Sequence, residues 1–326
     1  MNAKSRTRSL KNIVYHLSRI NEWWLLSLGM MLFAFIPNRY VANGRILDMG
    51  LFQEIFITPH FYLALIVVFS AQIFLFASND YYDRHVDALD PYKRKRNPVC
   101  SGDVTMGGVR ALLIVSGILP FIASMFFGMN ALIYTSVAMF IFFFYTAPPL
   151  RLKNKIGLDV ISHALFVNTF PYFFSLVALK DFTPGTTFLL AVIMMRSAMA
   201  QLFQEIRDHD VDKQVESNTV VALGQRRALW LVFSIYLSML ILSVGLLASY
   251  QIWEWGIELY YILIPILWFA YLPVFSKLMK SKNLGRSIER LWMGQGRTNR
   301  WQVVQYVSAF ALYAIVMLML WGIGYF

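Results

Sequence analysis

The chain of 326 residues is poor in charge and has almost no cysteine. Only 14% of the residues are charged and 58% are hydrophobic, with a mean hydropathy of +0.55, which excludes an ordinary soluble globule of this length. Cys100 is the sole cysteine, which excludes a disulfide framework and a thiolate metal cluster. Residues 1–21 lack the apolar core and cleavage site of a signal peptide. The shortage of charge and the high hydrophobic content indicate a protein of the lipid bilayer.

Long apolar runs predict an all-α, polytopic membrane bundle. A transmembrane helix needs about 20 mostly apolar residues. We expect about nine such helices, at residues 22–36, 59–78, 108–126, 129–148, 157–179, 186–204, 228–248, 256–275 and 303–322. No low-complexity linker separates them, so we predict a single integral-membrane domain over residues 1–326. Leu10, Ile13, Val14 and Leu17 form a stripe among basic residues, and residues 1–21 are therefore expected to form an amphipathic helix on the membrane surface.

The net charge of +11 is distributed unevenly. On the predicted topology 24 of the 29 Lys and Arg residues fall on one side of the membrane, only Arg39, Arg45 and Lys180 fall on the other, and Arg110 and Arg196 lie inside spans. Basic loops mark the cytoplasmic side of membrane proteins. The charge therefore predicts a multi-pass protein of the cell (inner) membrane, with a cytoplasmic N-terminus, an outer C-terminus and no nucleic-acid partner.

Two acidic triplets have identical spacing, Asp80, Asp83, Asp87 and Glu205, Asp208, Asp212. Positions i, i+3 and i+7 of a helix fall at roughly 0°, 300° and 340°, so each triplet lines one narrow stripe. Crowded carboxylates need a cation, and oxygen ligands suit Mg²⁺. The alternative, a solvated acidic helix end, is weakened by the repeat of the spacing. The pattern predicts two cytoplasmic half-sites for Mg²⁺ ions that hold a polyphosphate substrate.

The first acidic segment resembles the N-D-x-x-D-x-x-x-D signature of the UbiA superfamily of intramembrane prenyltransferases. The second is similar to that family's D-x-x-D-x-x-x-D signature, with Glu205 where aspartate is usual. The resemblance implies a helical bundle around a central cavity, with Asp80, Asp83, Asp208 and Asp212 as catalytic carboxylates. The implied Mg²⁺ ligands are Asn79, Asp80, Asp83, Asp87, Glu205, Asp208 and Asp212.

Two basic stretches resemble the family's diphosphate contacts. Residues 93–98 are similar to its basic stretch before R-P, although Asn97 intervenes, and Arg96 is the expected contact. Residues 145–153 are similar to a Tyr-x-x-Pro-Pro-Leu-Arg/Lys stretch, in which two prolines stiffen the turn. The resemblance implies that a diphosphate is bound by Arg96, Tyr145, Arg151 and Lys153, and we add Lys213, which follows the second triplet.

Polar residues inside the spans have a plainer interpretation. His163 and Asn168 both lie on the fifth predicted span. Side chains of this kind usually hydrogen-bond to a neighbouring helix. We therefore expect both to be satisfied structural groups.

These features together predict Mg²⁺-dependent transfer of a polyprenyl group from an allylic diphosphate to a lipophilic acceptor. Metal and basic side chains would neutralise the departing diphosphate, while an aromatic-lined cavity would shelter the carbocation from water. Residues 145–153 and the second acidic segment resemble the lycopene elongase-like branch of the family. A quinone-type aromatic, a glycerol lipid and a chlorophyll-like alcohol remain alternative acceptors. The alternative functions are a UbiA-type terpene cyclase and a membrane transporter, since intramembrane carboxylates also mark ion pathways.

Overall fold

The computed structural model describes residues 13–42, 57–89, 91–180, 182, 184–249, 272–288 and 290, which contain helices and no strand. The expected all-α class is therefore confirmed. The helices are η1 (Ile13–Leu17), α2 (Ile20–Ala42), α4 (Pro59–Asp87), α5 (Pro91–Arg96), α6 (Met106–Ser124), η2 (Met125–Phe127), α7 (Met129–Thr146), η3 (Leu152–Asn154), α8 (Leu158–Ala164), α9 (Thr169–Leu179), α10 (Pro184–Asp212), α11 (Thr219–Leu223), α12 (Gln225–Ser249), α14 (Leu272–Lys280) and α15 (Leu284–Ile288).

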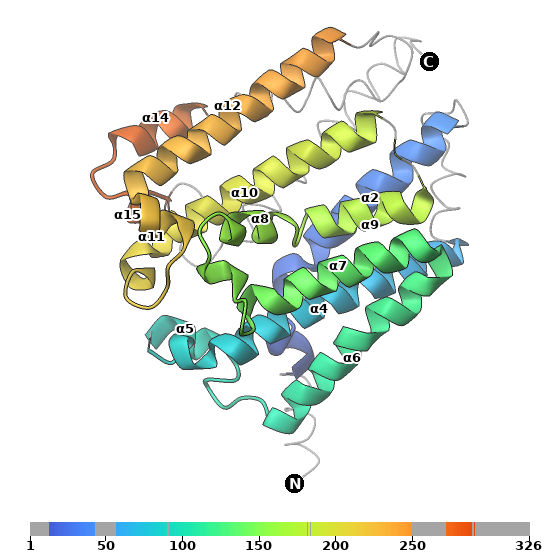
Figure 1. Ribbon diagram of the computed structural model, residues 1–326, viewed down its shortest axis with the longest axis horizontal. Coiled ribbons are helices and arrows are strands. Elements are labelled where there is room, and N and C mark those ends of the chain that lie inside the picture. The colour runs from blue at the N-terminus through green and yellow to red at the C-terminus, as the bar shows by residue number, and fades with distance from the viewer. Residues whose placement is uncertain are drawn as a thin grey trace. The chain divides into compact units, whose positions relative to one another are not determined.

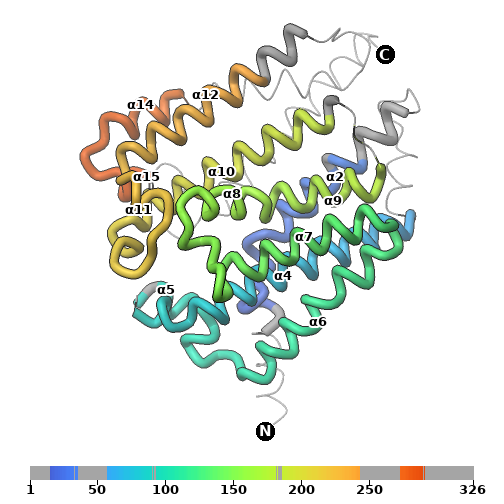
Figure 2. The backbone as a smooth tube through the Cα atoms, in the orientation of Figure 1, coloured from blue at the N-terminus to red at the C-terminus, as the bar shows by residue number. Residues whose placement is uncertain are grey.

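Five of these helices are long and apolar enough to cross a membrane. They correspond to α4, α6 with η2, α7, α10 and α12, all close to predicted spans. Helices α8 and α9 form a sixth candidate, with a bend of 52° between them that Figure 2 shows as a change of direction. The predicted span 22–36 lies within α2, whereas residues 256–271 and 303–322 lie outside the described residues. The membrane-protein class is confirmed, and the count of nine stays a prediction.

The chain divides into two compact units. Unit 1 takes its described residues from Met1–Asn38 and Asp48–Ala198, and unit 2 takes its described residues from Arg39–Leu47 and Met199–Phe326. The first acidic segment belongs to unit 1 and the second to unit 2. The prediction of a single domain is not tested by this division.

Helix α4 is the centre of unit 1, where it packs against α6, α7 and α9 (Figure 1). Its buried face carries many small side chains: Ala64, Ser70, Ala71, Ala77 and Ser78. Lipid tails are as apolar as protein side chains, so membrane helices associate mainly through close packing, which small residues permit. On α6, a Cβ added at Gly117 would lie 3.1 Å from a ring carbon of Phe74. The small residues of α4 and the glycine at position 117 of α6 therefore allow these two helices to pack closely.

Aromatic rings fill the space between α7 and the bend that separates α8 from α9. Phe142 meets Phe166 and Phe170 at centroid distances of 5.2 and 5.1 Å, with the ring planes at 89° and 72°. Such edge-to-face pairs add a modest attraction to the packing itself. The carbonyl oxygen of Phe166 accepts a hydrogen bond of 3.4 Å from Nε2 of Gln72, which ties the bend to α4.

In unit 2 the second half of α10 packs with α12, α14 and α15. Phe275 of α14 lies 6.0 Å from Phe203 and 4.8 Å from Tyr236, measured between ring centroids. A Cβ at Gly285 of α15 would lie 3.2 Å from the carbonyl oxygen of Arg207. The absence of a side chain at Gly285 therefore allows α15 to approach the backbone of the second acidic segment.

The N-terminal segment begins within unit 1. Leu17 is fully buried and packs with Ala77, Val104 and Val109. This residue of the predicted amphipathic stripe therefore contacts protein. Leu10 and the rest of residues 1–12 lie outside the described residues.

Candidate active site

Asp80 occupies a buried position near the end of α4. Its side chain has 0% exposure, and its Oδ1 accepts a hydrogen bond from Nη2 of Arg19, whose side chain is 13% exposed. Arg19 precedes α2 with a φ of 47°, a left-handed conformation that is unfavourable for a residue with a side chain. The other Asp80 carboxylate oxygen, Oδ2, is buried and has no hydrogen-bond partner among the described residues.

Carboxylates keep Arg19 charged despite its burial. Burial alone lowers the pKa of Arg19, but Asp80, Glu22 and Asp87 outweigh it and hold that pKa above its ordinary value. Glu22 also accepts a hydrogen bond of 2.6 Å from Nη2 of Arg96, the predicted diphosphate contact. The start of α2 is therefore joined to α4 and to the end of α5 by ion pairs.

Asp83 forms ion pairs with two basic side chains, Arg151 and Lys153, which the sequence predicted to bind the diphosphate. Its Oδ1 lies 3.1 Å from Nη2 of Arg151, and its Oδ2 lies 2.9 Å from Nζ of Lys153. Arg151 has a φ of 40°, a second left-handed residue with a side chain. The loop after α7 thus brings Arg151 and Lys153 back to α4, and three predicted site residues lie together.

Asn97 braces the first acidic segment. Its Nδ2 donates to Oδ2 of Asp87 at 2.8 Å and to the backbone carbonyl of Asp80 at 2.9 Å, while its Oδ1 accepts from the backbone N–H of Val99 at 2.9 Å. The buried amide thereby fixes the loop after α5 to the last turns of α4. Sequence reasoning noted Asn97 only as an interruption of the family pattern, and that interruption was the available signal of its role.

Asn79 immediately precedes Asp80 on α4 and is partly buried. Tyr145 lies on the last turn of α7. The Tyr145 side chain is in the unit 1 core, with its ring centroid 4.7 Å from that of Phe166 and 6.1 Å from that of His163. Tyr145 therefore lies beside the bend between α8 and α9, six positions before Arg151 along the chain.

The second acidic segment forms the end of α10, in unit 2. Glu205 is buried and accepts a hydrogen bond of 2.7 Å from Nε2 of Gln201. Asp208 accepts from Nε and Nη2 of Arg207, both at 2.7 Å, and Asp212 accepts from Nδ2 of Asn218 at 3.2 Å.

Asp210 differs from the three acids of the second stripe. Its side chain is 78% exposed and pairs with Lys213 at 3.3 Å. Lys213 is itself 51% exposed at its side chain, so this predicted diphosphate contact lies at the surface of unit 2.

The first acidic segment offers oxygen atoms, the type of ligand that a hard cation such as Mg²⁺ binds. Asn79, Asp80, Asp83 and Asp87 offer amide and carboxylate oxygens, the ligands that Mg²⁺ prefers. The unpartnered Asp80 Oδ2 is a buried lone-pair donor of this kind. Within the described ranges, no three His, Cys, Asp or Glu side chains lie close enough to form a metal site by themselves. The negative charge of Asp80 and Asp83 is instead neutralised by basic side chains.

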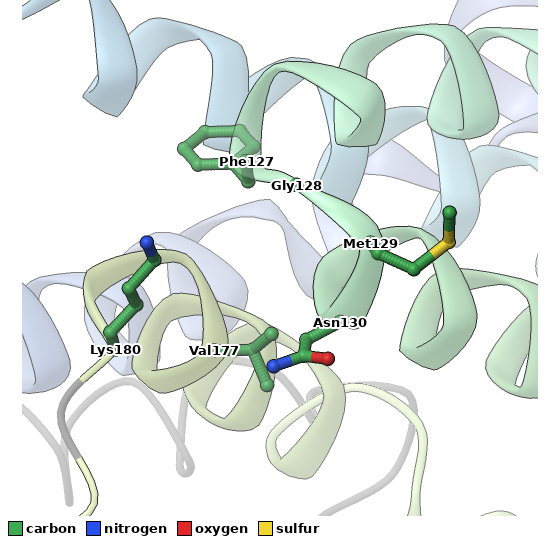
Figure 3. A pocket seen from close by; sticks show the side chains of 6 residues that line it. All are labelled: Phe127, Gly128, Met129, Asn130, Val177 and Lys180. Carbon is green, nitrogen blue, oxygen red and sulfur yellow. The ribbon is translucent and has the colours of Figure 1, made fainter.

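A cavity of about 200 Å³ lies at the other end of α7 from Tyr145. It is lined by Phe127, Gly128, Met129, Asn130, Val177 and Lys180, and Figure 3 shows the Lys180 and Asn130 side chains at its border. None of the predicted site residues lines it.

The fold and the buried acidic residues define a helical membrane protein that holds anionic side chains at the end of a long apolar helix. The model of the UbiA prenyltransferase family matches residues 49–294, and the chain belongs to that family. It is an intramembrane prenyltransferase.

Curated relatives support this assignment. The chain is 25% identical over 240 residues to a lycopene elongase/hydratase of Haloarcula japonica, covering 73% of the chain and 74% of that protein. It is 29% identical over 216 residues to a lycopene elongase/hydratase of Halobacterium salinarum, covering 63% and 75%.

Solved structures share the fold. A UbiA homologue from Archaeoglobus fulgidus bound to DMAPP and Mg²⁺ has a TM-score of 0.65 at 18% identity, over 95% of this chain and 99% of the other. The same homologue bound to GPP and Mg²⁺ has a TM-score of 0.63 at 18% identity, with 94% and 99% coverage. The UbiA-like bundle predicted from the sequence is therefore confirmed as the fold.

Proposed function

We propose that this prenyltransferase moves a polyprenyl group from an allylic isoprenoid diphosphate to a carotenoid acceptor of the lycopene type, with Mg²⁺ as its cofactor. The convergence of Arg151 and Lys153 on Asp83 carries the proposal, because it places two cations beside a carboxylate that suits a metal. Support for the acceptor comes from the lycopene elongase/hydratase relatives. Support for the donor and metal comes from the homologue bound to DMAPP and Mg²⁺.

In this proposal Asn79, Asp80, Asp83 and Asp87 would be metal ligands of the first acidic segment, and Glu205, Asp208 and Asp212 would be metal ligands of the second. When bound, Mg²⁺ neutralises the charge that develops on the departing diphosphate. Arg151 and Lys153 turn from Asp83 toward the diphosphate oxygens, with Tyr145, Arg96 and Lys213 as further contacts. The aromatic core around Phe142, Phe166 and Phe170 excludes water from the allylic cation.

The proposed orientation places the N-terminus and both acidic segments in the cytoplasm and the C-terminus outside, following the distribution of basic residues. A charged diphosphate would then enter from the cytoplasm while its hydrocarbon tail stays among membrane helices.

The test is product analysis with purified protein in lipid nanodiscs. GPP or DMAPP, with Mg²⁺, is supplied with lycopene, with a quinone-precursor aromatic acid, with a glycerol lipid, or with no acceptor. Lycopene is expected to gain the mass of one or more prenyl units, and chelation of Mg²⁺ is expected to abolish the gain. Prenylation of another acceptor alone would overturn the carotenoid assignment. A new hydrocarbon skeleton formed without acceptor would show a cyclase instead.

A further inference from the structure

His163 does not have the hydrogen bond expected of it. It lies on the last turn of α8, just before the 52° bend into α9. Asn168 does find a neighbour, since its Nδ2 lies 3.5 Å from Oγ of Ser197. Nδ1 of His163 is buried and has no partner among the described residues. An unsatisfied buried polar atom is unfavourable, and an ionisable residue inside a membrane domain commonly has a functional role.

A second unsatisfied atom lies in the same region. Gln72 of α4 is fully buried, and its Nε2 donates to the carbonyl oxygen of Phe166 while its Oε1 has no partner in the described part of the chain. Phe166 is also the neighbour of His163, with 5.0 Å between ring centroids. Gln72 and His163 therefore both contact Phe166 from different helices. Each has one buried polar atom without a hydrogen-bond partner among the described residues, Oε1 of Gln72 and Nδ1 of His163.

The chemistry of these two atoms points to a positive charge. An amide oxygen only accepts hydrogen bonds, and Nδ1 of a neutral imidazole accepts when the proton is on Nε2. Two aromatic rings lie beside His163, that of Tyr145 at 6.1 Å and that of Phe166 at 5.0 Å between ring centroids. Ring faces and lone pairs both favour a cation or an incoming proton. The cluster of Gln72, Tyr145, His163 and Phe166 belongs wholly to unit 1.

This cluster is joined to the diphosphate end of the site through α7. Tyr145 contacts His163 from the last turn of α7, and the loop that follows carries Arg151 and Lys153 to Asp83. The carboxylates of Asp80 and Asp83 are engaged by cations. His163 is thus a basic group in the aromatic interior that these ion pairs leave available.

We propose that His163 is the general base that receives the proton lost by the acceptor, an inference that rests on the proposed prenyl transfer. The allylic C–O bond breaks and its electron pair leaves with the diphosphate. A π bond of the acceptor then forms the new C–C bond to the allylic carbon, which leaves a cation on the acceptor. An adjacent C–H bond breaks, its electrons restore a double bond, and the imidazole takes the proton. Gln72 and the aromatic rings stabilise the positive charge during this step.

The experiment measures diphosphate release and prenylated product in the same reaction, using protein in nanodiscs. In H163Q and H163A, ionisation of the donor and formation of the C–C bond should continue, but the alkene product should fall by about 10²-fold, because water captures the acceptor cation to give a hydroxylated prenylated product. Added imidazole should restore part of the alkene product in H163A and none in H163F, whose ring fills the space. H60Q is the matched control, because His60 lies at the first turn of α4, 5.8 Å from the Phe127 ring.

An equal share of alkene among the prenylated products of H163Q and the native protein, together with no effect of imidazole on H163A, would overturn the proposal. The departing diphosphate would then be the base. Thermal unfolding of each variant identifies loss of the fold, and the near-isosteric H163Q keeps the test valid if H163A is unstable. Failure of the native protein to release diphosphate from any allylic donor would instead contradict the proposed function.

Discussion

At the scale of single residues, burial separates two ion pairs that join α2 to the rest of unit 1. The Arg19 and Asp80 side chains are 13% and 0% exposed, whereas those of Arg96 and Glu22 are 43% and 28% exposed. Removal of one partner from a buried pair leaves an uncompensated charge, at a cost of about 3–5 kcal/mol. An exposed pair contributes about 0–1 kcal/mol, because water and salt screen it.

R19Q should therefore lower the free energy of unfolding far more than R96Q, measured by thermal or denaturant unfolding of the detergent-purified protein. The double variant R19Q/D80N should regain part of the loss, since no charge is then left alone. Similar destabilisation by R19Q and R96Q would contradict the importance assigned to burial.

Arg151 and Lys153 lead to a kinetic prediction. Each makes a charged contact with Asp83, and each is expected to exchange that contact for a diphosphate oxygen. A hydrogen bond to a charged group contributes about 1.5–3 kcal/mol, so R151A and K153A should each weaken donor use by about 10- to 100-fold in kcat/KM. K155A, at an exposed position of the same loop, is the control. Equal kinetics for all three variants would remove this loop from the site.

At the scale of helices, the contact between α4 and α6 depends on one glycine. A side chain at Gly117 would meet the Phe74 ring at 3.1 Å, whereas one at Gly107 of the same helix meets nothing within 4 Å. Overpacking costs about 1–3 kcal/mol. G117L should thus lower the unfolding temperature clearly below that of G107L, which shares the gain in helix propensity. The reverse order would show that α6 is not held at this point.

The sequence predicted the helices better than the contacts between them. Helices α4, α6, α7 and α10 follow from continuous apolar runs, and the acidic stripes follow from spacing along one helix. The bend after α8 was missed, because Leu165, Phe166, Val167 and Asn168 contain neither glycine nor proline and continue the apolar run. The structure associates that bend with a tertiary contact, the hydrogen bond from Gln72 to Phe166.

In the candidate site too, residues with a local sequence pattern were predicted, whereas contacts between distant residues were not. Asp83, Arg151 and Lys153 were named from family resemblance and lie together. Arg19 was counted only as a basic residue that sets topology, although it forms an ion pair with Asp80 across 61 positions of the chain. No local pattern encodes a pairing over such a separation. For Asn97, the departure from the family pattern was visible, but its two hydrogen bonds to the acidic segment were not.

At the scale of the whole molecule, the single cysteine reports the orientation in the membrane. Burial raises the pKa of the Cys100 thiol, and the nearby Asp87 and Asp80 carboxylates raise it further. The thiolate is the reactive form, so labelling by a membrane-impermeant maleimide should be slow at neutral pH and faster as the pH rises. We expect labelling in inverted vesicles and none in intact cells.

The matched control is K180C in a C100S background, because Lys180 is exposed and is assigned to the outer face. It should label in intact cells. Labelling of Cys100 from outside, with K180C protected, would reverse the proposed topology.

The proposed Mg²⁺-dependent reaction requires both acidic segments. This requirement is tested most directly by Mg²⁺-dependent diphosphate release from DMAPP in D80N, D208N and D210N, with thermal unfolding to verify that each is folded. We predict that D80N and D208N each lose about 10²-fold or more, because each removes stabilisation of the departing charge, while D210N, altered at an exposed residue off the stripe, stays near the native rate. Native-like turnover in folded D80N and D208N would contradict the account.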